Sequence, residues 1–94
     1  MISIVLLGTG NVAKHLFDAF LGVDEIIMLQ VIGRNEGHLA HFKDKVPTGT
    51  DFTQIVDADI YMIAVSDDAI ALVAPYLKEK KGIVVHTSGS VILK

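Results

Sequence analysis

Two glycines near the start of the chain have the spacing of an anion-binding turn. Gly8 and Gly10 are followed by Ala13, which gives the pattern G-x-G-x-x-A within LLGTGNVAKHL. The first glycine turns the chain, the second leaves room for a pyrophosphate, and the third small residue packs a helix on a strand. Free N–H groups at the helix start then face the anion. A tight turn without a ligand is the alternative, and the flanking elements must decide.

A second polar group, Gly33, Arg34 and Asn35, follows the apolar run at residues 26–32. Sites that prefer NAD place a carboxylate there to bind the ribose hydroxyls, whereas a guanidinium pairs with the 2′-phosphate of NADP. Arg34 therefore favours NADP, with NAD as the second choice. Glu36 weakens this inference, and an ordinary surface arginine is the alternative.

The remaining polar groups follow later strands. Ala64, Val65 and Ser66 end one apolar run, and we expect them to flank a ribose or the nicotinamide, since ligands bind at the carboxyl ends of parallel strands. The adjacent Asp67 and Asp68 favour helix capping over acid–base catalysis.

His86, Thr87 and Ser88 follow the last strand, at the same edge of the predicted sheet. Thr87 is a candidate cofactor contact, and His86 and Ser88 are candidate substrate contacts. The alternative is a hydrogen-bonded histidine that closes a strand. A serine hydrolase is disfavoured because no nucleophile-elbow pattern surrounds the serine.

Metal chemistry is not indicated. The chain has no cysteine, and His38 and His41, three residues apart, lack further convincing ligands, so we expect no metal site. The basic run at residues 78–81 is interpreted as a solvated helix end.

Elements that position these residues alternate along the chain. Strands are expected at residues 2–7, 26–32, 46–49, 60–65 and 83–85, and helical segments lie between them. In the first helix the spacing of Val12, Leu16 and Phe20, with Ala13 and Phe17 beside them, predicts an apolar face. Pro75 is expected to kink or split the last helix. The order predicts an α/β fold: a doubly wound sheet of about five parallel strands with helices on both faces.

Size and composition fit one domain over residues 1–94. The 94 residues are 51% hydrophobic, with a net charge of −3. That charge argues against nucleic acid as a partner, since phosphate backbones attract basic faces. The opening apolar run is too short for a membrane span, so we expect a soluble cytoplasmic protein with no membrane partner.

Four segments resemble a known family. GTGNVAKHL, GRN, DADIYMIAVSDDAI and VVHTSGSV are similar to the N-terminal domain of Rossmann-like proteins that carry the domain of unknown function DUF2520. These proteins are related to F420-dependent NADP oxidoreductases and pyrroline-5-carboxylate reductases. The resemblance implies an NAD(P)-binding Rossmann domain. Its motifs imply that Gly8, Gly10, Asn11 and Val12 line the pyrophosphate, with Arg34 at the adenosine ribose. Thr9 in the same loop and Asn35 beside Arg34 are further expected contacts of the cofactor.

Members of that family continue into a second, mainly helical domain that closes the active site. This chain stops soon after HTSG, so we expect a truncated domain that is inactive alone and that self-associates or needs further chain. The favoured function is an NADP-binding domain of an oxidoreductase that transfers hydride between the nicotinamide and a small substrate. The alternative is a non-catalytic dinucleotide-binding or sensing module.

Overall fold

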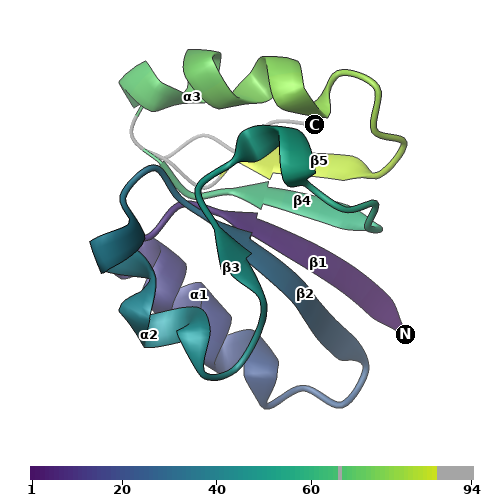
Figure 1. Ribbon diagram of the computed structural model, residues 1–94. Coiled ribbons are helices and arrows are strands. Elements are labelled where there is room, and N and C mark those ends of the chain that lie inside the picture. The colour runs from purple at the N-terminus through teal and green to yellow at the C-terminus, as the bar shows by residue number, and fades with distance from the viewer. Residues whose placement is uncertain (66, 87–94) are drawn as a thin grey trace.

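The computed structural model describes residues 1–65 and 67–86 of the chain (Figure 1). The strands and helices alternate, as the sequence predicts. They are β1 (Ile2–Leu7), α1 (Asn11–Leu21), β2 (Ile26–Ile32), α2 (Ala40–Lys43), β3 (Thr48–Gly49), β4 (Ile60–Ile63), α3 (Asp67–Val73) and β5 (Ile83–His86). Single 3₁₀ turns occupy Glu36–Leu39, Phe52–Gln54 and Ala74–Leu77.

The five strands form one parallel sheet in the order β3-β2-β1-β4-β5. Helices α1 and α2 cover one face of this sheet, and α3 covers the other (Figure 1). This is the α/β, Rossmann-type arrangement that the sequence predicts. Because all strands are parallel, their carboxyl ends meet at one edge, where the glycine turn lies.

Strand β1 supplies side chains to both faces, which explains its unbroken apolar sequence. Ile4 and Leu6 pack with Phe17 of α1 and Phe42 of α2 in one buried cluster. The alternate residues Val5 and Leu7 pack on the other face, in the cluster that includes Tyr61 and Val73. The central strand is thus buried from both sides, and burial sets its register against β2 and β4.

Among the local predictions, that for Val12 is wrong, strand β3 is shorter than the expected residues 46–49, and the split of the last helix at Pro75, one of the two expected outcomes, is confirmed. Val12 was expected on the apolar face of α1 but is 52% exposed, because the buried stripe runs through Ala13 and Phe17. Strand β3 has only two residues and lies at the sheet edge after Pro47, which cannot donate to a ladder. Pro75 splits the last helix, so that α3 ends at Val73 and a 3₁₀ turn follows.

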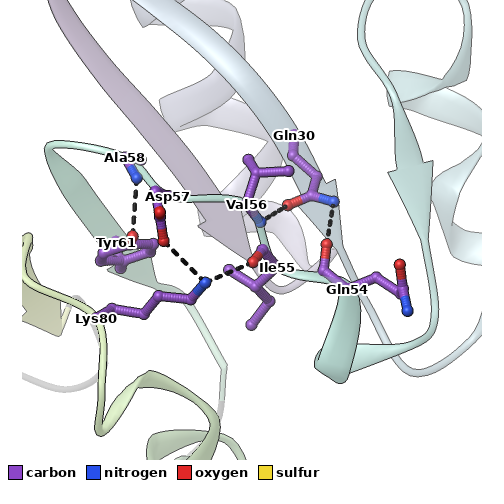
Figure 2. Close-up of polar contacts among 8 residues, drawn as sticks. All are labelled: Gln30, Gln54, Ile55, Val56, Asp57, Ala58, Tyr61 and Lys80. Atoms are coloured by element: carbon purple, nitrogen blue, oxygen red, sulfur yellow. Dashed lines mark hydrogen bonds and ion pairs between the residues drawn. The ribbon is translucent and has the colours of Figure 1, made fainter.

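The segment between β3 and β4 is held by side chains from distant elements (Figure 2). Gln30 of β2 donates to the Gln54 carbonyl at 3.1 Å and accepts from the Val56 N–H at 3.1 Å. The Tyr61 hydroxyl accepts from the Ala58 N–H at 2.8 Å. These contacts satisfy backbone groups that have no strand partner.

Lys80 also holds this segment in place. The interpretation of the basic run at residues 78–81 as a solvated helix end is therefore wrong for this lysine. Its ammonium donates to the Ile55 carbonyl at 2.8 Å and to Asp57 at 3.0 Å (Figure 2). The Lys80 side chain is only 22% exposed, so this lysine is a structural contact and not part of a solvated face. The sequence showed the charge run but not which lysine would meet a carbonyl.

Asp59 joins the start of β4 to the start of β1. Its carboxylate accepts from the Ser3 N–H at 2.9 Å and from the Ser3 hydroxyl at 3.1 Å. These two donors, the backbone N–H first, lower the pKa of Asp59 below the ordinary aspartate value of 3.8.

Replacement of that charge should give a pH-dependent loss of stability. A lowered folded pKa means that the carboxylate stabilises the fold above pH 3.8, and this contribution disappears as the pH falls through the folded pKa. We expect Asp59→Asn to melt below the parent chain at pH 7, with the gap closing as the pH is lowered below 3.8 and through the folded pKa. Thermal melts followed by circular dichroism measure it. Asp24→Asn, at an exposed carboxylate, is the control, and an Asp59→Asn gap that does not vary with pH would contradict the assignment.

Candidate functional site

The turn from β1 into α1 is built around Gly8. Its φ of +127° lies in a region that side-chain-bearing residues rarely adopt, and a Cβ placed there would lie 2.3 Å from the Ala64 carbonyl oxygen. The Gly8 N–H donates to the Ile32 carbonyl at 2.8 Å, so the turn continues the ladder towards β2. The first glycine of the motif is therefore required by the fold itself, whether or not a ligand binds.

Gly10 has a different environment. It is the N-cap of α1, and a Cβ built on it meets no atom within 4 Å. No side chain caps this helix start, and the first turn holds no acidic residue. The positive end of this 11-residue helix dipole is thus not neutralised by a cap or by the helix's own first turn, which suits an anion.

The tip of β2 packs directly against the glycine turn. A Cβ on Gly33 would lie 2.5 Å from the Thr9 methyl carbon, so a side chain at this position would have to displace that of Thr9. Asn35 caps the following 3₁₀ turn, because its side-chain oxygen accepts from the Gly37 N–H at 2.8 Å. Arg34, between these two residues, is exposed.

A cavity of about 540 Å³ lies at this edge of the sheet. Its walls come from the glycine turn, the tip of β2, the segment after β3, the end of β4 and helix α3. The described residues that line it are Gly8, Thr9, Gly10, Gly33, Arg34, Asn35, His38, Phe52, Ala64, Val65, Ala69 and Val73. Its volume is in the range of small-molecule and cofactor sites.

Most of the residues predicted from the sequence meet in this cavity. Those found there are Gly8, Thr9, Gly10, Arg34, Asn35, Ala64 and Val65. Asn11 and Val12 begin α1 next to it, both exposed, but do not line it. Ser66, Thr87 and Ser88 lie outside the described residues. The assignment of these residues to a cofactor stays a prediction.

His86 ends β5 beside the end of β4, where it pairs in register with Ile63. Its Nδ1 atom is buried and has no hydrogen-bond partner within residues 1–65 and 67–86. It lies at the predicted edge of the sheet but does not line the cavity, so its contact with a substrate stays a prediction.

Five lining residues were not assigned to the site from the sequence: Gly33, His38, Phe52, Ala69 and Val73. Gly33 was visible as the residue before Arg34, and His38 follows Arg34 by four positions. Phe52 gave no signal, because it reaches the cavity from a segment that the polar contacts of Gln30 and Lys80 hold in place.

The described part of the chain contains no cluster of three or more His, Asp or Glu residues suited to a metal ion. His38 and His41, which the sequence places close together, have different environments. His41 contacts Asp18 at 3.0 Å and packs against the rings of Phe17 and Phe42, whereas His38 lines the cavity. Within residues 1–65 and 67–86, no helix is long and apolar enough to cross a membrane.

No protein-family model matches the chain, and no curated protein matches its sequence. Solved structures do resemble it. A Bacteroides fragilis protein assigned as an NADP oxidoreductase superimposes with a TM-score of 0.84 and 29% identity, over 96% of this chain and 37% of the other. The present chain thus spans little more than a third of that protein.

Two more distant structures share the fold. Synechocystis biliverdin reductase, solved with biliverdin and NADP+, has a TM-score of 0.77 and 20% identity over 90% of this chain and 28% of its own. Saccharopine dehydrogenase (L-Glu forming) from Saccharomyces cerevisiae has a TM-score of 0.73 and 22% identity over 97% of this chain and 22% of its own. The class defined by fold and site is a Rossmann-type α/β domain with a cavity at the carboxyl edge of its sheet.

Substitution of the two glycines in the turn should change the free energy of unfolding by different amounts. Gly8→Ala forces an L-residue to a φ of +127° and against the Ala64 carbonyl, so we expect a loss of at least about 2 kcal/mol of unfolding free energy. Gly10→Ala, at φ −76°, meets no neighbour and should stay within about 1 kcal/mol of the parent chain. Urea unfolding measures both, and equal losses would contradict the geometry.

Proposed function

We propose that this chain is an NADP-binding domain of an oxidoreductase. The observation that carries the proposal is the cavity in which the glycine turn, the uncapped start of α1 and the side chain of Arg34 meet. The pyrophosphate of a dinucleotide needs a backbone that it can approach closely and N–H groups that donate to it. Gly10 provides the first, and the first turn of α1 provides the second. The similarity to the Bacteroides fragilis protein supports this proposal.

The preference for NADP over NAD follows from charge. Binding of the free ribose hydroxyls of NAD relies on a carboxylate at the tip of β2, and no acidic residue is among the described residues that line the cavity. Glu36, the nearest acidic residue in sequence, accepts from Lys43 at 3.5 Å instead. Arg34 can pair with a 2′-phosphate through two parallel N–H donors. The biliverdin reductase that shares this fold was solved with NADP+.

The apolar side of the cavity fits the adenine ring. Phe52, Ala69 and Val73 form that side, and the Phe52 ring is held by Tyr76, with ring centroids 5.7 Å apart. Ala64 and Val65, at the end of β4, continue the wall towards His86. Ser66 and Thr87 stay proposed contacts of the cofactor, and His86 and Ser88 proposed contacts of the substrate, on the sequence pattern alone.

In this proposal the bound nicotinamide supplies hydride chemistry, and the chain supplies binding and orientation. The helix start and Gly10 hold the pyrophosphate, Arg34 fixes the adenosine end, and the close contact of Gly8 with Ala64 keeps the turn in place. The substrate class is a small imine, ketone or alcohol. A partner domain or a second copy covers the site, as in the DUF2520-type proteins that the motifs resemble.

Nucleotide titration tests the proposal. We expect NADPH to bind more tightly than NADH in isothermal calorimetry. Gly10→Ala should weaken both nucleotides by about tenfold or more, because its Cβ occupies the space of the pyrophosphate. Gly22→Ala is the matched control, since Gly22 ends α1 away from the cavity and its Cβ would meet only the Ala19 carbonyl at 3.9 Å.

The variant Arg34→Ala should affect the affinities for NADPH and NADH differently. We expect a loss of about 10- to 100-fold for NADPH, typical of a hydrogen bond to a charged group, and little change for NADH. If neither nucleotide binds at millimolar concentration, the proposed function is wrong. If Arg34→Ala weakens both nucleotides equally, the role of Arg34 at the 2′-phosphate is wrong.

A further inference from the structure

His38 lines the same cavity as Arg34, although it lies four residues further along the chain. The 3₁₀ turn Glu36–Leu39 places it there. The turn is fixed at its start by the Asn35 side chain, which accepts from the Gly37 N–H at 2.8 Å, and by the Asn35 carbonyl, which accepts from the His38 N–H at 3.0 Å. Leu39, only 1% exposed, anchors its end in the core. The backbone of His38 is therefore held firmly while its side chain stays exposed.

Three basic side chains that follow His38 in the sequence already have partners. Lys43 donates to Glu36 at 3.5 Å, and His41 contacts Asp18 at 3.0 Å. Lys45 donates to the His41 carbonyl at 3.4 Å. Within residues 1–65 and 67–86, the side chains of Arg34 and His38 have no hydrogen-bond or ion-pair partner. Both basic side chains that line the cavity are thus free to contact a ligand.

A phosphate monoester offers several acceptor oxygens, and one guanidinium satisfies only part of them. A second donor at the same end of the cavity completes such a site. An imidazole N–H is suited to this role, and no described acidic side chain lines the cavity to compete for it.

We propose that His38 is a second ligand, together with Arg34, for the 2′-phosphate of NADP, and that this pair sets the preference for NADP over NAD. This inference rests on the proposed function and goes beyond it, because it assigns the specificity to a residue outside the glycine turn and the β2 tip. His38 donates an N–H to a phosphate oxygen, and Arg34 pairs with the other oxygens.

The test uses nucleotide fragments that isolate this end of the ligand: 2′,5′-ADP, which carries the 2′-phosphate, and ADP, which lacks it. Calorimetric titrations are run on the full chain and on His38→Ala, His38→Lys and Arg34→Ala. His15→Ala is the matched control, because His15 is an exposed histidine on α1 that does not line the cavity. A thermal melt of each variant checks that the fold is retained.

We expect His38→Ala to weaken 2′,5′-ADP by about tenfold and to change ADP affinity by less than twofold. His38→Lys, which supplies an N–H donor at the same position, should restore most of the 2′,5′-ADP affinity, and His15→Ala should change neither ligand. Arg34→Ala should lower 2′,5′-ADP affinity at least as strongly as His38→Ala.

Three outcomes would overturn the inference. If 2′,5′-ADP binds and Arg34→Ala weakens it but His38→Ala does not, His38 is not a ligand and the proposed function stands. If His38→Ala weakens both fragments equally, its role is not specific to the 2′-phosphate. If neither fragment nor NADPH binds the parent chain, the proposed function fails together with this inference.

Discussion

The close approach of the Gly8 backbone to the Ala64 carbonyl sets the shape of the carboxyl edge of the sheet. A side chain at Gly8 would overlap that carbonyl, and the backbone there has a φ of +127°. Because the turn is pressed against the end of β4, helix α1 starts directly above the sheet edge, with its positive end at the cavity. A second close contact, between Gly33 and Thr9, brings the tip of β2 beside the same turn. The cavity therefore depends on two close contacts at glycines, one against the Ala64 carbonyl and one against the Thr9 methyl group.

Hydrogen bonds far from the cavity complete its walls. Phe52 comes from a segment with little regular structure, and that segment is fixed by Gln30 and Lys80 through backbone carbonyl and N–H groups (Figure 2). These hydrogen bonds pair backbone groups that have no partner in a helix or strand, and so restrict the segment. The aromatic wall of the cavity thus depends on hydrogen bonds that side chains of β2 and of Lys80 make to the Phe52 segment.

Much of this frame could be predicted from the sequence. The apolar runs of β1, β2 and β4 and the alternation of strands with helices predict the parallel sheet, and the glycine spacing identifies its turn. Val12 shows the limit of periodicity: four-residue spacing placed it on the apolar face, but the stripe through Ala13 and Phe17 leaves it exposed. The spacing could not distinguish two adjacent faces of one helix.

The site itself was only partly predictable. Residues within the glycine turn and the β2 tip were identified, because their positions follow from local rules. His38 and Phe52 were not, since their direction depends on a 3₁₀ turn capped by Asn35 and on contacts across the sheet. Lys80 was read as solvated, because a charge run does not reveal which member meets a carbonyl.

The most direct test of the account is an amide NMR titration of the chain with NADPH. If the cavity holds the dinucleotide, the largest shift changes fall on the N–H groups of residues 8–13 and 33–38, where the turn, the helix start and the β2 tip meet. Those of residues 22–25, which join the end of α1 to the start of β2 at the opposite edge of the sheet, should stay small. Changes confined to residues 22–25, or no saturable change at millimolar NADPH, would contradict the account.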